Sequence, residues 1–154
     1  MVQDPKEHAR RERERYVDTN DFNEKVIAEF RANNGVVGGP LEGAPLLLLT
    51  HTGSKTGESR TIPLVYLKEG DRYIIFASAG GSDHNPGWYY NLVNQPTVTI
   101  EVGDDSIEVE ATELHPPEST QLYDLQASNR PDFEAYRQAT SREIPVIALT
   151  QSKS

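Results

Sequence analysis

Short apolar segments separated by turn residues dominate the chain from Pro45 onward. The apolar run over Leu46 to Thr52 predicts a buried strand, and Thr61 to Leu67 predicts a second one. The turn Glu69-Gly70-Asp71 leads into a third strand, Arg72 to Ala77, because Gly and Asp favour tight hairpins. Hairpin connections of this kind predict strands that pair mainly in an antiparallel way.

The second half of the chain continues this pattern. Thr97 to Val102 and Ser106 to Thr112 alternate apolar and polar residues on either side of Gly103-Asp104-Asp105, as the arms of a hairpin do. Ile144 to Leu149 predicts a closing strand. We therefore expect a mainly β, α+β fold: a small barrel of about six antiparallel strands with flanking helices.

Helices are predicted between these strands and ahead of them. Apolar residues at helical spacing follow Asp21-Phe22-Asn23-Glu24, which resembles a capping box. Asn85 as N-cap and Pro86 at the first helical position predict a short helix. Pro117 to Ala127 and Asp132 to Thr140 predict two more helices near the end of the chain.

The length of 154 residues favours one domain, which we place at residues 21–150. Residues 1–20 form a charged N-terminal extension. Its charges alternate in sign and nearly cancel, which is typical of a solvated terminal helix. A lid, or contact with a membrane surface, is the alternative interpretation of this extension.

Composition excludes several kinds of function. The net charge of −9 opposes nucleic-acid binding, because no extended basic stripe offsets it. The absence of cysteine excludes disulfides, thiolate metal sites and a cysteine nucleophile. The histidines lack metal-ligand spacing, so no metal is predicted. No apolar run is long enough to span a bilayer, and we expect a cytoplasmic protein, with peripheral contact at the inner face of the cell membrane as the alternative.

The loop between the first two predicted strands concentrates hydrogen-bond donors. Gly53 and Gly57 allow backbone N–H groups to turn inward, and such concavities bind anions. Lys55 supplies a point charge, and Arg60 supplies a planar fork suited to phosphate or carboxylate. Neutral hydroxyl donors surround these cations at Thr52, Ser54, Thr56 and Ser59. A plain polar hairpin loop with ordinary surface charges is the alternative.

A second donor-rich segment spans Ala77 to Asn91. A strand ends at Ser78, and a glycine-rich turn leads to a helix N-terminus, which favours anions. Trp88 and Tyr89 offer flat surfaces for a ring system. The alternatives are that Trp88 is a core anchor and that His84 is a capping or solvent-facing residue.

These two segments together resemble the deazaflavin-dependent nitroreductase family, whose members use reduced coenzyme F420 and include F420H2-dependent quinone reductases. The resemblance runs from about Phe22 to Leu149. It rests on motifs in a fixed order: Thr52-Gly53-Ser54-Lys55-Thr56-Gly57-x-x-Arg60, Pro63-Leu64, Gly70-Asp71-Arg72-Tyr73, Ala77-Ser78-x-Gly80-Gly81, Asn85-Pro86-x-Trp88-Tyr89-x-Asn91-Leu92, Asn94-x-Pro96 and Arg142-x-Ile144-Pro145-Val146.

The resemblance implies a flavin-reductase-like split β-barrel and reduced F420 as the cofactor. It also implies a set of residues around the cofactor's phosphate, acidic tail and ring. They are Ser54, Lys55, Thr56, Arg60, Thr61, Ile62, Pro63, Leu64, Val65, Phe76, Ala77, Ser78, Ala79, Gly87, Trp88, Tyr89, Tyr90 and Asn91, and the Thr52 hydroxyl joins them as a cofactor-binding candidate.

The implied reaction is hydride transfer to a quinone, nitro or enone-type acceptor. A hydroxyl near the acceptor would stabilise the negative charge that develops there, and Ser78 and Tyr136 are the catalytic candidates. Members that activate nitro compounds have a tyrosine cluster whose positions here are Arg130, Phe133 and Tyr136, so these three are the substrate candidates. Arg130 would favour an anionic substrate.

Other departures from the family pattern concern charge. The family loop often has Arg where this chain has Ser54, and often has Lys where it has Ala79. Both changes remove positive charge near the cofactor. Three alternatives stay open: a flavin mononucleotide (FMN) enzyme on the same barrel, a non-catalytic F420-binding or carrier protein, and a plain binding domain. A homodimer is a further expectation, because barrels of this type often pair.

Overall fold

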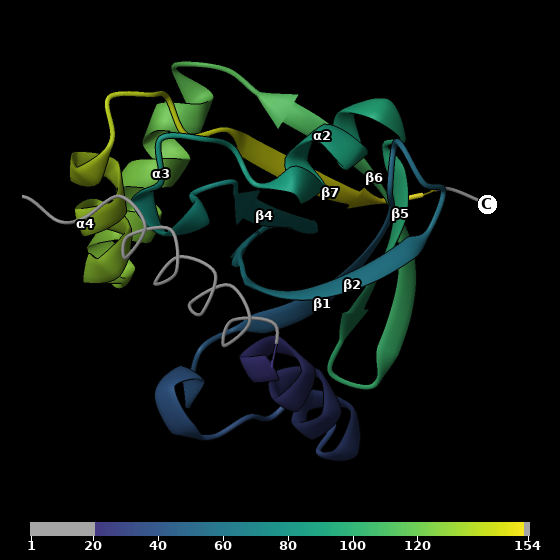
Figure 1. Cartoon of the computed structure of the whole chain (residues 1–154). Helices are drawn as coiled ribbons and strands as arrows, with labels where there is room; N and C mark the ends of the chain where they lie inside the picture. The colour runs from purple at the N-terminus through teal and green to yellow at the C-terminus, as the bar shows by residue number, and fades with distance from the viewer. Residues whose placement is uncertain (1–20, 153–154) are drawn as a thin grey trace, which may run out of the picture.

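The computed structural model describes residues 21–152, which form one seven-stranded sheet flanked by helices (Figure 1). The strands are β1 (Leu46–Thr52), β2 (Ser59–Val65), β3 (Leu67–Glu69), β4 (Arg72–Phe76), β5 (Thr97–Val102), β6 (Asp105–Leu114) and β7 (Val146–Gln151). Their order across the sheet is β2-β1-β5-β6-β7-β4-β3. Every neighbouring pair is antiparallel, as the hairpin pattern predicted.

The sheet must curl because its two edge strands are consecutive in the chain. β2 and β3 lie at opposite ends of the strand order, yet only Tyr66 separates them. The backbone N–H of Tyr66 donates to the Pro45 carbonyl at 3.0 Å, and its ring packs edge-on against Tyr73. The predicted strand Thr61 to Leu67 is therefore two strands that meet at this corner, and the expected split-barrel fold is confirmed.

Alternate side chains of the curled sheet fill its interior. Leu47, Leu49, Ile75 and Leu149 are fully buried there. Burying each such side chain contributes about 1.5–3 kcal/mol. Trp88, which is 6% exposed, joins this cluster from α2 (Gly87–Asn94). The alternative interpretation of Trp88 as a core anchor is therefore confirmed. This packing fixes α2 over one open end of the barrel.

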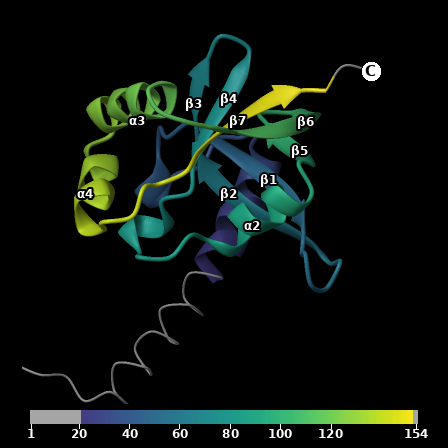
Figure 2. The same cartoon turned by 90° about the horizontal axis from the view of Figure 1, so that it is seen from above.

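Two further helical layers cover the outer faces of the sheet (Figures 1 and 2). The helices α3 (Glu118–Asn129) and α4 (Pro131–Ala139) pack on β4 and β7. Their contact centres on Phe76, whose ring lies 5.5 Å from Tyr123 and 5.6 Å from Phe133. On another face, helix 21–32 packs Val26 and Phe30 against the outward side chains of β1.

Two predicted helix starts differ from the structure. The N-cap of α2 is Pro86, with no side-chain cap, whereas the sequence predicted Asn85. The Asn85 side chain instead accepts a hydrogen bond from Arg142, a residue far along the chain. Residue 21 is already helical, so the predicted capping box is wrong, and the N-terminal extension lies outside the described residues.

A glycine is required where the chain passes from β4 beneath α4. Gly81 has φ +86°, and a Cβ there would lie 2.9 Å from the Ala139 Cβ and 3.0 Å from the Tyr136 carbonyl. Its neighbour Gly80 also has a positive φ, but nothing would lie within 4 Å of its Cβ. Both glycines thus have a positive φ that disfavours other residues, and of the two only Gly81 lacks room for a Cβ.

This pair predicts a difference in stability. Gly80→Ala should lower the free energy of unfolding by about 1 kcal/mol, the cost of a positive φ in alanine. Gly81→Ala should lower it by about 2–4 kcal/mol, because the added Cβ also displaces α4. Urea unfolding of both variants measures the difference, and equal losses would contradict the described contact.

Candidate functional site

A cavity of about 450 Å³ opens where α2, the adjoining ends of β1 and β2, and helix 21–32 meet. It is lined by Asn23, Glu24, Ile27, His51, Arg60, Thr61, Ile62, Pro86, Gly87, Trp88 and Asn91. Arg60, Thr61 and Ile62 belong to the first predicted cofactor segment, and Gly87, Trp88 and Asn91 to the second. The fold therefore brings parts of both segments into one cavity.

The side chain of Asn91 links the elements around this cavity. Its Oδ1 accepts a hydrogen bond from the backbone N–H of Ser54 at 3.0 Å. Its Nδ2 lies 2.9 Å from Nδ1 of His51, which is buried at the end of β1. One amide on α2 thus holds both the loop between β1 and β2 and the end of β1.

The backbone of that loop is largely bonded within the protein. The N–H of Gly53 donates to the Glu58 carbonyl at 2.8 Å, and that of Gly57 donates to the Gly53 carbonyl at 2.8 Å. The N–H of Glu58 donates to the Thr56 hydroxyl, and that of Ser54 to Asn91. The predicted concavity of inward N–H groups is wrong for these four donors, because three of them close the loop's own turn and the fourth binds Asn91 of α2. The side chains of the loop are its other donors.

The cationic side chains of the loop face solvent. Lys55 and Arg60 are exposed, as are Ser54 and Thr56, while Thr52 is half-buried at the end of β1. Exposed cations can follow a flexible anionic group without the cost of desolvating a buried charge. The loop and the cavity are continuous through Arg60, which belongs to both.

His51 is the titratable group most enclosed by the cavity wall. Its side chain is 6% exposed. Burial first, and the nearby Arg60 second, lower the pKa of His51 below its usual value. His51 is therefore a neutral imidazole at physiological pH.

Several predicted cofactor residues lie in the core instead of the cavity wall. Leu64 packs against the barrel interior, and Ala77 is fully buried there. Ile62 packs against the same interior and also lines the cavity. Phe76 is enclosed by the aromatic rings of α3 and α4. Pro63 and Val65 are half-buried on β2 and do not line the cavity. These residues shape the site from behind it.

The two tyrosines of α2 lie outside the cavity. The hydroxyl of Tyr89 donates to Glu113, which raises the pKa of Tyr89 to about 12. Tyr89 lines a different cavity of about 380 Å³, which α2 shares with β6. Tyr90 is exposed, with its ring against that of Tyr89. Of the two predicted flat surfaces, Trp88 borders the 450 Å³ cavity and Tyr89 does not.

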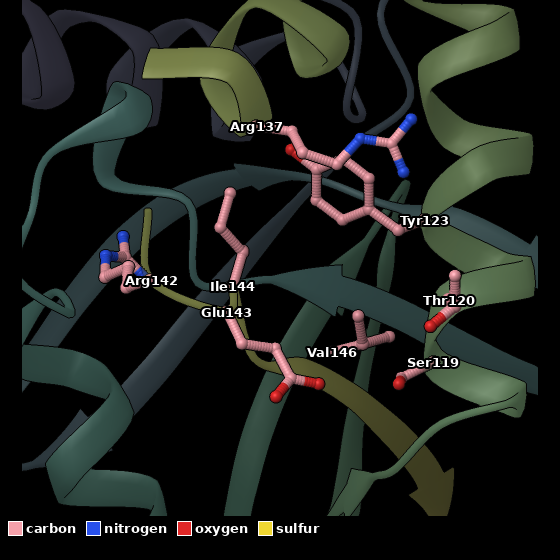
Figure 3. Close-up of a pocket in the computed structure, with 8 residues that line it drawn as sticks. All are labelled: Ser119, Thr120, Tyr123, Arg137, Arg142, Glu143, Ile144 and Val146. Carbon is pink, nitrogen blue, oxygen red and sulfur yellow. The ribbon is translucent and has the colours of Figure 1, made fainter. Parts of the chain in front are cut away.

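The turn after β4 is held by one arginine that sequence reasoning did not select. Nη2 of Arg142 donates to the Ser78 and Ala77 carbonyls at 2.9 and 3.2 Å. Its Nε donates to the Ser82 carbonyl at 2.7 Å, and its Nη1 donates to Asn85 at 2.7 Å. Figure 3 shows Arg142 and Arg137 among the residues that line a smaller cavity, with Arg137 across the ring of Tyr123. Arg142 appeared in the sequence only as part of a closing motif.

The three substrate candidates lie on the α4 side of this turn. Arg130 is the residue between α3 and α4, and Phe133 is buried at 7% exposure. Tyr136 packs its ring against Phe133 at 5.3 Å, and its backbone lies against Gly81. Gly81 N–H donates to the Ser78 carbonyl, so Ser78 and Tyr136 belong to the same local assembly. None of the three substrate candidates lines the 450 Å³ cavity.

Sequence reasoning missed five residues of the cavity wall. His51 lies beside the loop that was selected for its donors, but the histidines were considered only as metal ligands, and their spacing did not fit. Pro86 was assigned to the helix start. Asn23, Glu24 and Ile27 come from a helix whose packing partner is far along the chain, so no local pattern indicates them.

The described part of the chain has neither a cluster of metal-ligating side chains nor a candidate membrane helix. Residues 21–152 contain no group of three or more His, Asp or Glu side chains placed to hold a metal ion. None of the helices in the same range has the length and apolar content that a bilayer crossing requires.

Residues 23–151 match the F420H(2)-dependent quinone reductase family. The chain belongs to this family. It is 41% identical over 128 residues to the F420H(2)-dependent quinone reductase Rv1261c of Mycobacterium tuberculosis, covering 80% of this chain and 86% of that protein. It is 36% identical over 105 residues to the putative F420H(2)-dependent quinone reductase Rv3178 of the same organism, covering 68% and 88%.

Solved structures agree with the fold. An F420-H2 dependent reductase, FDR-A, is 35% identical and superposes with a TM-score of 0.63, covering 68% of this chain and 93% of that one. A protein described as a domain-swapped dimer is 31% identical, with a TM-score of 0.65 and coverage of 95% and 99%. The family resemblance expected from the ordered motifs is confirmed, and family membership implies F420 as the cofactor.

The site residues fit such a cofactor. The cavity volume lies within the range of about 300–1,000 Å³ that is usual for small-molecule sites. Its wall combines Trp88, neutral polar side chains, the guanidinium of Arg60 and the carboxylate of Glu24, and exposed Lys55 lies in the adjoining loop. A ligand with a flat ring and an anionic tail matches that order of apolar, neutral and cationic groups.

The Arg142 contacts predict a specific loss on substitution. Arg142→Ala should lower the free energy of unfolding by about 2–4 kcal/mol and weaken F420 binding, because four acceptors lose a charged donor. Arg142→Lys should recover only part of this, since an ammonium cannot span the same acceptors. Urea unfolding and fluorescence titration of F420 measure both effects.

Arg137→Ala is the matched control. Arg137 pairs with Asp124 and Glu134 on the helical surface and lies over the ring of Tyr123, and exposed ion pairs contribute less than about 1 kcal/mol. If Arg137→Ala and Arg142→Ala lower the free energy of unfolding and the F420 affinity equally, the hydrogen bonds of Arg142 to the turn after β4 have no special role.

Proposed function

We propose that this protein is a reductase that uses reduced F420 to convert quinones to hydroquinones. The observation that carries the proposal is the single cavity to which Arg60, Thr61 and Ile62 contribute from one predicted cofactor segment, and Gly87, Trp88 and Asn91 from another. Family membership supports the cofactor and the class of reaction. The relatives' printed activity supports quinones as the acceptor.

The chain's own residues bind, orient and shield. No side chain carries a hydride, and the reduced deazaflavin supplies it when bound. Lys55 and Arg60, with the hydroxyls of Thr52, Ser54 and Thr56, would hold the phosphate and carboxylates of the cofactor. Trp88 and Gly87 would flank the flat ring, because a glycine beside an indole edge leaves room for a planar group.

The remaining predicted cofactor residues would act through backbone or support. Ala77, Ser78 and Ala79 form the turn that Arg142 holds, and their carbonyls and the Ala77 N–H are bonded within the protein. The N–H groups of Ser78 and Ala79 would therefore be the backbone donors that this turn offers to a ligand. Phe76 and the β2 residues Pro63 to Val65 would keep the wall rigid behind it. Tyr89 and Tyr90 would need to move to reach the cavity, since Tyr89 is bonded to Glu113.

Ser78 and Tyr136 are the proposed catalytic residues. A quinone oxygen gains negative charge as the ring accepts a hydride, and a hydroxyl donor placed at that oxygen stabilises the charge. The proposal is supported by Gly81, whose N–H donates to the Ser78 carbonyl and whose backbone lies against that of Tyr136. Arg130 and Phe133 would select the acceptor from the same side, and Arg130 would favour an anionic one. Nitro and enone compounds are the other acceptors to compare.

An FMN enzyme and an F420 carrier are the alternatives to this reductase, and a homodimer and a cytoplasmic location are further proposals. An FMN enzyme would use the same cavity, and a carrier would bind F420 without turnover. A homodimer is supported by the 31% identical structure described as a domain-swapped dimer. We place the reaction in the cytoplasm, where quinones are reached at the membrane surface.

The anion-binding side chains predict a large and salt-dependent effect on affinity. Lys55→Ala with Arg60→Ala should weaken F420 binding on the order of 100-fold at low salt, because two charged contacts are lost. The loss should shrink as ionic strength rises, since exposed charges are screened. Fluorescence titration at several salt concentrations measures this dependence.

The charge-matched control is Arg31→Ala with Lys68→Ala. Arg31 pairs with Glu101, and Lys68 lies over the ring of Tyr73, both outside the cavity. If the control weakens F420 binding as much as the Lys55 and Arg60 pair, the loop is not the anchor.

Turnover separates the proposed activity from its alternatives. The wild-type protein with reduced F420 should reduce quinones, and NADPH should not replace the cofactor. Ser78→Ala and Tyr136→Phe should each lower kcat on the order of 100-fold with little change in F420 affinity, because each removes a donor at the developing charge.

Different outcomes point to different alternatives. Tight F420 binding without turnover of quinone, nitro or enone acceptors would support a carrier. Purified protein that is yellow with bound FMN would support a flavin enzyme. Full activity in both hydroxyl variants would remove Ser78 and Tyr136 from catalysis.

A further inference from the structure

The buried imidazole of His51 has no part in the proposed function above, yet it forms part of the cavity wall. It lies at the end of β1, beside Arg60, Trp88 and Asn91. A buried polar ring in a ligand cavity needs hydrogen-bond partners on its polar atoms. The partners of its two nitrogens decide what it can offer to a ligand.

The tautomer of His51 follows from the orientation of Asn91. The backbone N–H of Ser54 can only donate, so the Asn91 atom 3.0 Å from it is the acceptor Oδ1. The atom 2.9 Å from His51 Nδ1 is therefore the amide nitrogen, which can only donate. Nδ1 must accept, and the proton of the neutral ring resides on Nε2.

The same contacts oppose the charged form of the ring. An imidazolium would direct an Nδ1–H against the amide hydrogens of Asn91, and two donors cannot share a hydrogen bond. Burial, and the positive charge of Arg60, act in the same direction by lowering the pKa of His51. The ring thus presents a neutral donor in a single tautomer.

The Nε2–H is left for a group in the cavity. Within residues 21–152 no hydrogen bond is made to His51 Nε2, while Nδ1 is bonded to Asn91. The buried side-chain polar atom without a partner in this part of the chain is Gln126 Nε2, so His51 Nε2 is not sealed inside the protein. The cavity that the ring lines is its route to a ligand.

We propose that His51 donates a hydrogen bond from Nε2 to an acceptor oxygen of the bound cofactor, and that Asn91 is the positioning residue that fixes this tautomer. The proposal rests on F420 being the ligand of the cavity. Its ring carbonyls, hydroxyls, phosphate and carboxylates all offer such oxygens. Because the donor is neutral, it adds direction without charge, and its contribution should not change with ionic strength.

The tautomer is tested first in the protein without cofactor. Long-range proton–nitrogen NMR distinguishes the protonated ring nitrogen from the unprotonated one. Wild-type His51 should show a proton on Nε2 and a free lone pair on Nδ1 at neutral pH. In Asn91→Asp the carboxylate accepts from both neighbours, so the proton should appear on Nδ1. An Nδ1–H or charged ring in the wild type, or no change in Asn91→Asp, would overturn the assignment.

Titration of F420 then tests the donor. The Nε2 resonance of His51 should shift on binding, while that of exposed His84 should not. Affinity should fall about two- to tenfold in His51→Asn, the range expected for one lost neutral hydrogen bond, at both low and high salt. His51→Gln should stay close to wild type, because glutamine places an amide N–H near the position of Nε2.

A merely structural role would give the opposite order. Asparagine retains an acceptor near the position of Nδ1, so a ring that only supports Asn91 would tolerate His51→Asn better than His51→Gln. That order, or an Nε2 resonance unchanged by bound F420, would contradict this inference alone. A wild-type protein that does not bind F420 would contradict the proposed function and the inference together, whereas His84→Gln should behave as wild type.

Discussion

The closure of the sheet through a single residue is the constraint on which the site depends. Because only Tyr66 separates the two edge strands, β2 must continue into β3 around a corner, and the sheet curls. The curl leaves an open end between the barrel and helix 21–32, and α2 is fixed there by Trp88. A flat sheet of the same strands would hold the β1–β2 loop and α2 apart.

A small polar network turns this geometry into a binding site. Asn91 joins α2 to the loop backbone and to His51, while Arg142 joins the turn after β4 to the chain before β7. Asn91 and Arg142 each form hydrogen bonds with several backbone, side-chain or ring atoms. These bonds matter because a buried polar atom without a partner lowers the stability of the fold. In a chain of net charge −9, the neutral donors would position a ligand and the few local cations would supply attraction.

Local sequence predicted most of the fold and about half of the cavity. The bounds of β1 and β5 match the predicted segments, because continuous or alternating apolar residues and adjacent turns specify them locally. The predicted N-cap of α2 was wrong because the Asn85 side chain accepts a hydrogen bond from Arg142 instead of capping the helix. Asn23, Glu24 and Ile27 line the cavity because their helix packs against segments far along the chain. Local sequence patterns do not predict such packing. The direction of Tyr89 depended in the same way on Glu113, two strands further along the chain.

F420 should occupy the cavity shared by β2 and α2. Backbone amide NMR spectra recorded during an F420 titration test this placement most directly, because each residue reports separately. The largest shifts should fall within residues 51–62 and 86–91, with smaller ones in helix 21–32. Shifts centred instead on the cavity of Tyr89, Val93 and Ala111, or on that of Tyr123 and Arg137, would contradict it.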